Sequence, residues 1–191
     1  MQKKIKETFK QSVLTTLKII DNEQLIKEIA NVAKELIYLF KKEGKVLLCG
    51  NGGSAADAQH IAAELSGQFY LKRTPLFAEA LHVNTSFLTA IGNDYHFNEV
   101  FARAVEAKGK EGDALIAIST SGNSKNVLNA IKAAKKKNML TIGLTGEAGG
   151  SMISMCDYLI QVPSTDTPRI QESHILIGHI ICELVENEIF G

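Results

Sequence analysis

The stretch VLLCGNGGSAADAQH, residues 46–60, decides the fold. It opens with the apolar run Val46-Leu47-Leu48, which is typical of a buried strand, turns through three glycines, and continues as a helix from Ser54. Glycines let backbone N–H groups approach a ligand closely, and the positive end of a helix dipole favours negative charge. The stretch therefore predicts a strand, an anion-binding turn and a helix.

The sequence of this turn matches neither of two known glycine-rich loop patterns completely. A P-loop needs a lysine before its Ser or Thr, but here Gly53 is followed directly by Ser54. Residues 50–55 match the dinucleotide fingerprint loosely, and that fingerprint also needs an acidic residue about 20 positions on. The nearest candidate, Glu79, lies inside a later apolar stretch. Taken alone, the glycines could also serve only to tighten the turn.

A second loop of this kind follows the apolar run at residues 113–118. It has the sequence Ser119-Thr120-Ser121-Gly122-Asn123-Ser124 and leads into a helical pattern. One hydroxyl is enough to cap a helix, so four hydroxyls and an amide indicate an oxyanion with several acceptor atoms, such as a phosphate monoester. Neither loop contains Arg or Lys, which favours neutral donors and a helix dipole. Both loops should open on the same edge of a parallel sheet.

Two further side chains are candidates for metal binding or proton transfer. His60 and Glu64 lie one helical turn apart on the same face of the helix that follows the first loop. On an exposed helix such a pair can also be merely solvated. His179 lies between apolar residues of the last helical pattern, where a hydrogen-bonded core histidine would also fit.

Helical patterns occupy both ends of the chain, and strands alternate with helices between them. Strands are predicted at residues 45–49, 77–82, 113–118, 139–144 and 157–161. We expect one domain, residues 1–191, in which residues 1–43 form two helices that contribute to an oligomer and residues 44–191 form the α/β core. Its parallel sheet should be covered on both faces. The last helix, about 168–189, is apolar over more than one stripe, which indicates a partner subunit.

Composition excludes several classes of protein. The 21 basic and 21 acidic residues give zero formal net charge, so no electrostatic surface for nucleic acid is indicated. No apolar run approaches the roughly 20 residues of a membrane span, and the N-terminus does not resemble a signal peptide. Cys49, Cys156 and Cys182 lack metal or disulfide spacing and fit buried thiols in a reducing compartment. We therefore expect a cytoplasmic protein.

The order of the motifs resembles that of the sugar isomerase (SIS) family over nearly the whole chain. The motifs are Cys49-Gly50-Asn51-Gly52-Gly53-Ser54 with His60 and Glu64, Gly92-Asn93-Asp94, Ile118-Ser119-Thr120-Ser121-Gly122-Asn123-Ser124, and Arg169-Ile170-Gln171-Glu172 with His179. The resemblance implies a three-layer, flavodoxin-like fold with a five-stranded parallel sheet and an N-terminal helical extension. It also implies a homotetrameric isomerase that converts sedoheptulose 7-phosphate to D-glycero-D-manno-heptose 7-phosphate through an enediol, for surface-glycan synthesis.

The same resemblance implies the roles of individual residues. Glu64 and His179 would transfer protons. One divalent metal per subunit, expected to be zinc, would be held by His60, Glu64, Gln171 and His179. Substrate contacts are expected from Asn51, Gly52, Gly53, Ser54, Glu64, Asn93, Asp94, Ser119, Thr120, Ser121, Ser124 and Gln171. Gln171 and His179 are about 12 Å apart along one helix, so either they lean toward each other or a neighbouring subunit supplies one side.

Two positions depart from the family's pattern. Gln68 stands where relatives often have Arg, which puts a cationic substrate contact at that point in doubt. Pro168 precedes Arg169, where some relatives carry an acid, and Asp166 is the nearest possible substitute.

Two other functions stay open at this point. A non-catalytic adaptor that binds the replication initiator would have lost the acid and base residues, whereas Glu64 and His179 are both present. A sugar-phosphate sensor would need the two loops but not the four proposed metal ligands together. The sequence therefore favours the enzyme.

Overall fold

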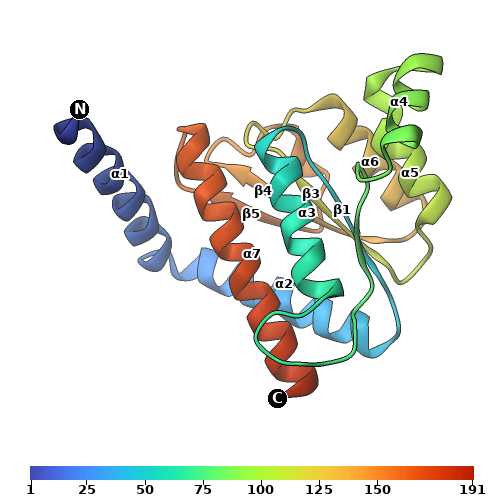
Figure 1. Cartoon of the computed structure of the whole chain (residues 1–191), viewed down its shortest axis with the longest axis horizontal. Helices are drawn as coiled ribbons and strands as arrows, with labels where there is room; N and C mark the ends of the chain where they lie inside the picture. The colour runs from blue at the N-terminus through green and yellow to red at the C-terminus, as the bar shows by residue number, and fades with distance from the viewer.

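The computed structural model describes residues 1–191 and contains one five-stranded sheet with helices on both faces (Figure 1). Its strands are β1 (Val46–Cys49), β2 (Ala78–Ala80), β3 (Ala114–Ile118), β4 (Leu140–Gly146) and β5 (Tyr158–Val162). They pair in the order β2-β1-β3-β4-β5, and every pairing is parallel. In the centre, Leu48 is in register with Ala80 on one side and Ile116 on the other. The predicted fold class and all five predicted strands are confirmed.

Alternate side chains of each strand enter two different cores. Val46 and Leu48 point to a cluster of 28 buried residues, whereas Leu47 and Cys49 point to a cluster of 18 on the other face. All four residues of β1 are buried because helices cover both faces of the sheet.

The larger core lies between the sheet and one layer of helices. The helices on this side are α2 (Glu23–Lys41), α3 (Gly53–Ser66) and α7 (Thr167–Phe190), preceded by α1 (Gln2–Ile20). The first two helices break at Asp21 and Asn22, because the Asn22 side chain accepts a hydrogen bond from the Leu25 N–H and caps the start of α2. The second helix belongs to the layer, and α1 alone extends away from the body (Figure 1).

The smaller core lies against the opposite face. It is covered by α4 (Thr85–Asp94), α5 (Val100–Lys108) and α6 (Lys125–Lys136), with the short 3₁₀ turns η1 (Phe97–Glu99) and η2 (Gly150–Ser154). No helix combines the length and the apolar character that a membrane span requires.

The strand order reverses between β1 and β3, which are neighbours in the sheet. After β1 the chain continues into α3 on one face of the sheet, and after β3 it continues into α6 on the other face. The two connecting loops therefore diverge from neighbouring positions on the carboxyl edge. Such a switch point is where open α/β sheets bind ligands. Both loops singled out in the sequence lie here.

Candidate active site at the carboxyl edge of the sheet

The glycine loop, residues 50–53, joins β1 to α3. Gly52 has φ +56°, a left-handed conformation that favours glycine, and a Cβ at Gly50 would come within 2.5 Å of the Ser54 carbonyl oxygen. The helix begins at Gly53, one residue earlier than predicted, and no side chain caps it. The N–H groups of Ser54 and Ala55 bond only to the turn carbonyl oxygens of Asn51 and Gly52, so no side chain competes with an anion at the start of α3.

The hydroxyl loop, residues 119–124, joins β3 to α6. The Ser119 Oγ lies 3.0 Å from the Ser124 Oγ and 3.5 Å from the Ser121 Oγ. Although Ser124 occupies the N-cap position of α6, its side chain does not cap that helix. Three hydroxyls thus converge on one another, and at the helix N-terminus behind them only the Val127 N–H is bonded to a side chain, the Asn126 Oδ1 at 3.0 Å. Thr120 lies in the same loop and is partly buried.

An amide pair joins the two loops. Asn51 Nδ2 donates to Asn126 Oδ1 at 2.9 Å, and Asn126 Nδ2 donates back to Asn51 Oδ1 at 2.8 Å. Asn126 is 3% exposed, so these bonds are shielded from water. Asn126 was not predicted as a site residue, because the sequence gives no signal that separates it from an ordinary residue in a first helical turn.

Gln171 reaches the glycine loop from the second turn of α7. A Cβ at Gly53 would lie 2.5 Å from Gln171 Nε2 and 2.7 Å from its Oε1, so the amide packs directly on the loop backbone. Gln171 and His179 lie eight residues apart on α7, which is a rise of about 12 Å. Within one chain, Gln171 therefore lies beside the glycine loop and away from His60 and His179.

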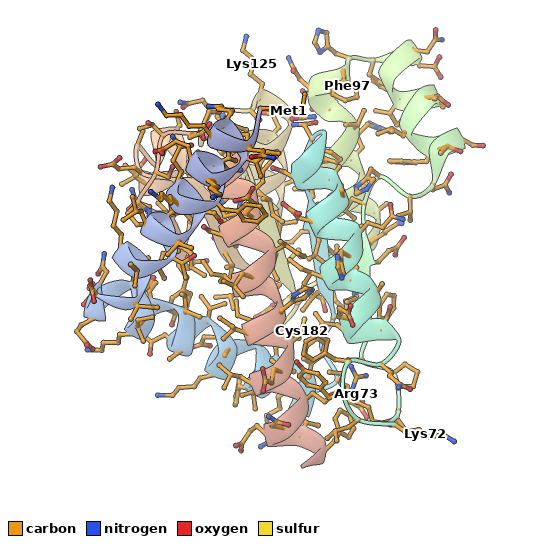
Figure 2. The ribbon with its side chains drawn as sticks, turned by 60° about the vertical axis from the view of Figure 1, so that its left-hand side comes forward. Met1, Lys72, Arg73, Phe97, Lys125 and Cys182 are labelled. Atoms are coloured by element: carbon orange, nitrogen blue, oxygen red, sulfur yellow. The ribbon has the colours of Figure 1, made fainter.

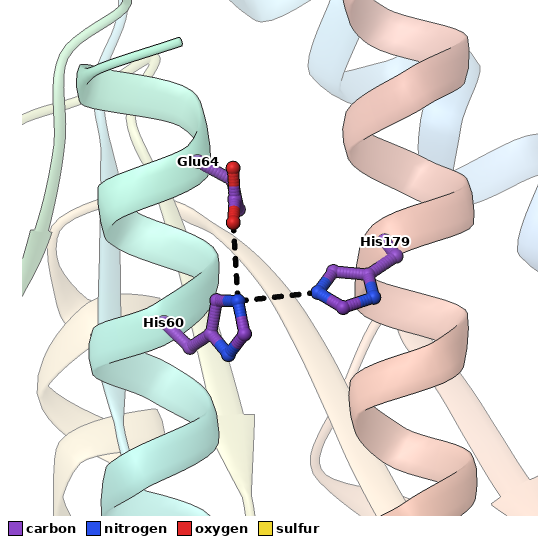
Figure 3. A group of neighbouring side chains, drawn as sticks. All are labelled: His60, Glu64 and His179. Carbon is purple, nitrogen blue, oxygen red and sulfur yellow. Dashed lines mark hydrogen bonds and ion pairs between the residues drawn. The ribbon is translucent and has the colours of Figure 1, made fainter. Parts of the chain in front are cut away.

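The structure brings His60, Glu64 and His179 together between α3 and α7 (Figure 3). The His60 Nε2 lies 3.1 Å from the Glu64 Oε1 and 3.2 Å from the His179 Nε2. One candidate ligand atom from each residue lies within 4.8 Å of the other two. His179 comes from a position 119 residues along the chain from His60, and its ring also packs against Phe69 with ring centroids 5.6 Å apart.

The chemistry of these donors fits a divalent metal. At most one proton can lie between the two imidazole Nε2 atoms, so at least one of them presents a lone pair toward the other. A carboxylate oxygen completes a set of two nitrogens and one oxygen, which is the ligand type of catalytic zinc sites with an open position.

Asp57 is a further acidic group on this helix, one turn before His60. Its Oδ2 is buried and has no hydrogen-bond partner. Burial raises the pKa of Asp57 to about 6, opposed in part by the neighbouring His60. Asp57 was not predicted as a site residue, since a polar residue near the start of a helix ordinarily faces water.

Other residues of interest lie away from the two loops and the histidines. Asn93 and Asp94 end α4, where both are exposed and Asn93 Nδ2 donates to Asp94 Oδ1 at 2.8 Å. Gln68 and Pro168 are exposed. Glu79, the one acidic residue considered for a dinucleotide ribose, is paired with a lysine, Lys108 of α5.

Comparison with known proteins agrees with this geometry. A family model described as the SIS domain matches residues 8–146. Phosphoheptose isomerase 2 of Campylobacter jejuni is 55% identical over 187 residues, which cover 98% of this chain and 93% of the relative. The phosphoheptose isomerase of Clostridium acetobutylicum is 53% identical over 191 residues, covering 100% of this chain and 97% of the relative.

Solved structures give the same result. Phosphoheptose isomerase from Neisseria gonorrhoeae has a TM-score of 0.92 and 43% sequence identity, covering 97% of this chain and 98% of that one. A phosphoheptose isomerase from Francisella tularensis has a TM-score of 0.93 and 38% identity over the same shares of the two chains. Both the sequence and the fold are therefore matched along nearly their whole length, and the chain belongs to the SIS-domain family and, within it, to the phosphoheptose isomerases.

Proposed function

We propose that this protein converts sedoheptulose 7-phosphate to D-glycero-D-manno-heptose 7-phosphate. The observation that carries the proposal is the layout of α3, which begins at the glycine loop and carries His60 two turns later. His60 lies seven positions after Gly53, which is a rise of about 10 Å along the helix. A heptulose 7-phosphate has its phosphate and its carbonyl at opposite ends of an extended carbon chain, so one substrate can reach both parts of the site.

The chemistry requires two kinds of proton transfer. A ketose becomes an aldose when one proton moves from C1 to C2 and another moves between the oxygens on these carbons, through an enediol. Glu64 and His179 are the groups that we assign to these transfers, because both lie within 3.2 Å of the His60 Nε2 and all three side chains face one space. This pair also distinguishes the enzyme from a SIS-type adaptor or sensor, neither of which needs it.

The proposed cofactor is one divalent metal per subunit, of which zinc fits the donors best. His60, Glu64 and His179 would hold it, and the family likeness adds Gln171 as a fourth ligand. Because Gln171 lies beside Gly53 in its own chain, we assign this fourth ligand to a neighbouring subunit. When bound, such an ion supplies Lewis-acid stabilisation of negative charge on the sugar oxygens.

The proposed assembly is a homotetramer. Apolar side chains on the outer faces of α1 and α7 are at least 39% exposed, namely Ile5, Phe9, Val13, Leu17, Leu176, Ile180 and Leu184. Two helices with such faces offer two contact surfaces, as a tetramer of dihedral symmetry needs. Ile180 adjoins His179, so a partner on α7 would border the site.

Sedimentation can test this assembly. We expect a tetramer for the parent protein and smaller species for Phe9→Glu, whereas Tyr38→Glu, an exposed position on α2, should sediment like the parent. A parent protein that is fully active as a monomer would contradict the proposal.

We assign the protein to the cytoplasm. All three cysteines are free, and burial raises the pKa of the Cys182 thiol to about 12, which keeps that thiol unreactive. Buried reduced thiols of this kind suit a reducing compartment.

An assay of the purified protein on sugar phosphates of different length tests the proposed function. Sedoheptulose 7-phosphate should be converted, fructose 6-phosphate should react far more slowly because it is one carbon shorter, and a chelator should abolish activity that zinc restores. Phosphate binding without conversion of any ketose phosphate would favour a sensor instead.

A further inference from the structure

A buried carboxylate on α7 holds the loop that follows α3. The Glu186 side chain is 1% exposed and accepts hydrogen bonds from the N–H groups of Phe69 at 3.1 Å, Tyr70 at 2.7 Å and Leu71 at 2.7 Å. The Arg73 Nε donates a fourth bond at 2.7 Å. Burial raises the pKa of Glu186, but these bonds outweigh it and hold the pKa below its usual range, so the group is ionised.

Arg73 continues the network to the end of α3. Its guanidinium is 2% exposed and donates to the carbonyl oxygens of Glu64 at 2.8 Å and Leu65 at 3.0 Å. The last carbonyl groups of a helix have no partner within the helix. Arg73 satisfies the carbonyl oxygen of Glu64 and shares that of Leu65 with the Leu76 N–H. The side chain of Glu64 lies beside His60.

The same network reaches His179 by two routes. Glu186 lies seven residues after His179 on α7, which places both on the same face two turns apart. Phe69, whose N–H is bonded to Glu186, packs its ring against His179. Figure 2 labels Arg73 in the region where the loop after α3 meets the C-terminal half of α7. The Arg73–Glu186 pair therefore connects the backbone of Glu64 with the helix and the ring that surround His179.

We propose that Arg73 and Glu186 are positioning residues that set the placement of Glu64 relative to His179. This inference rests on the proposed function, in which these two side chains transfer protons and share a metal. Apolar residues often replace a buried ion pair without loss of stability, so such a pair is better explained by the geometry that it specifies. An error of about 1 Å in the placement of reacting groups can reduce the rate by about 10²-fold.

The main test is Glu186→Gln, which keeps the size of the side chain and removes its charge. We expect kcat on sedoheptulose 7-phosphate to fall by roughly 10–100-fold. The KM should change little, since the phosphate loops are untouched. The dissociation constant for zinc, measured by competition with a chelator, should rise by roughly 10–100-fold. In the metal-free protein the imidazole ¹⁵N signals of His60 and His179 should shift.

Two control variants separate positioning from general stability. Asp113 is also fully buried and accepts hydrogen bonds from two backbone N–H groups and a lysine, but its partners are Lys45 and Lys110, and none of these bonds involves α3, α7 or the loop that follows α3. Asp113→Asn should lower the melting temperature and leave kcat, zinc affinity and both imidazole signals unchanged. Glu188→Gln, which breaks an exposed pair with Lys41 two residues beyond Glu186, should change none of these quantities.

A second variant covers the case in which Glu186→Gln does not fold. Arg73→Lys keeps a charge beside Glu186 but lacks the planar guanidinium that donates to the Glu186 carboxylate and to the carbonyl oxygens of α3 together, so a smaller loss of kcat and zinc affinity is expected. The proposal is overturned if a folded variant melts at lower temperature while kcat, zinc affinity and the imidazole signals stay at parent values. Failure of the parent protein to isomerise any substrate would refute the proposed function alone, because zinc affinity and the imidazole signals would still decide the positioning role.

Discussion

The two ends of α3 are held in opposite ways. At its N-terminus no side chain caps the helix, the adjoining glycines are exposed, and the neighbouring loops contain no charged residue. At its C-terminus the buried Arg73 guanidinium bonds the last carbonyl groups and is itself paired with Glu186. Each end leaves backbone groups without a partner in the helix, which are N–H groups at the N-terminus and carbonyl groups at the C-terminus.

The open N-terminal end of α3 is thus suited to binding a ligand, and the closed C-terminal end is suited to holding the site in place. The open end leaves N–H groups and hydroxyls for a ligand that is not part of the chain, and neutral donors let a phosphate enter and leave. The closed end uses a charge pair that the chain supplies itself and that water does not reach. His60 and Glu64 lie between them, so a ligand at one end and a fixed network at the other define the reacting region.

Removing donors from the open end should have the largest effect. In Ser119→Ala with Ser124→Ala, each lost hydrogen bond to a charged phosphate weakens binding by about 1.5–3 kcal/mol, so KM should rise by at least about 10²-fold. The measurement is steady-state kinetics together with thermal melting. Ser86→Ala, an exposed position on α4, serves as the control. An unchanged KM in a double variant that melts normally would show that the hydroxyl loop does not hold the phosphate.

Breaking the closed end should reduce stability instead. Arg73→Met leaves Glu186 buried without its cation, and loss of one partner of a buried pair destabilises a protein by about 3–5 kcal/mol. Lys41→Met breaks the exposed pair with Glu188 and should change the unfolding free energy by about 1 kcal/mol or less. Urea unfolding measures both. If the two variants lost equal stability, the contrast between the ends of α3 would not hold.

The free energy of unfolding, measured over a series of pH values, tests the packing of α7, which contacts both ends of α3. His174 is fully buried between Gln171 and Glu186 along this helix, and burial lowers its pKa to about 4, opposed in part by a hydrogen bond with the Thr145 carbonyl oxygen. The unfolded chain binds a proton near pH 6.5 and the folded chain only near 4, so stability is lost as the pH falls through this window, by up to about 3 kcal/mol. His174→Gln should flatten that slope, and the exposed His96→Gln should not. Equal slopes in all three proteins would refute this assignment.

The smallest effect is expected at the turn itself. Gly52 has φ +56°, and a Cβ added there would meet no atom within 4 Å. Gly52→Ala should therefore destabilise the protein by about 1–2 kcal/mol, through backbone strain alone. Denaturant unfolding measures the loss, and a variant as stable as the parent would show that the left-handed turn is not required.

The sequence predicted the fold well because its signals are local. Each strand is a short apolar run, and the glycine loop can be recognised from six consecutive residues. The pairing of His60 with Glu64 also follows from their spacing on one helix. His179 was brought in by family resemblance alone, since nothing local joins residues 119 positions apart.

The supporting residues could not be predicted for a physical reason. Arg73 and Glu186 are separated by 113 positions, and charged residues in a loop and near the end of a helix ordinarily face water. Asn126 likewise looks like any residue at a helix start, and its role depends on Asn51 in another loop. Such contacts exist only after the sheet has brought distant segments together.

Turnover of sedoheptulose 7-phosphate by Glu64→Gln, with bound zinc measured in the same sample, tests the central claim most directly. The amide keeps the size of the side chain and removes its basicity. We predict that kcat falls by ~10²–10⁴ while substrate and metal stay bound. A variant that retains its metal and turns over at the parent rate would contradict the assignment of Glu64 as a proton-transfer group and, with it, the mechanism proposed for this site.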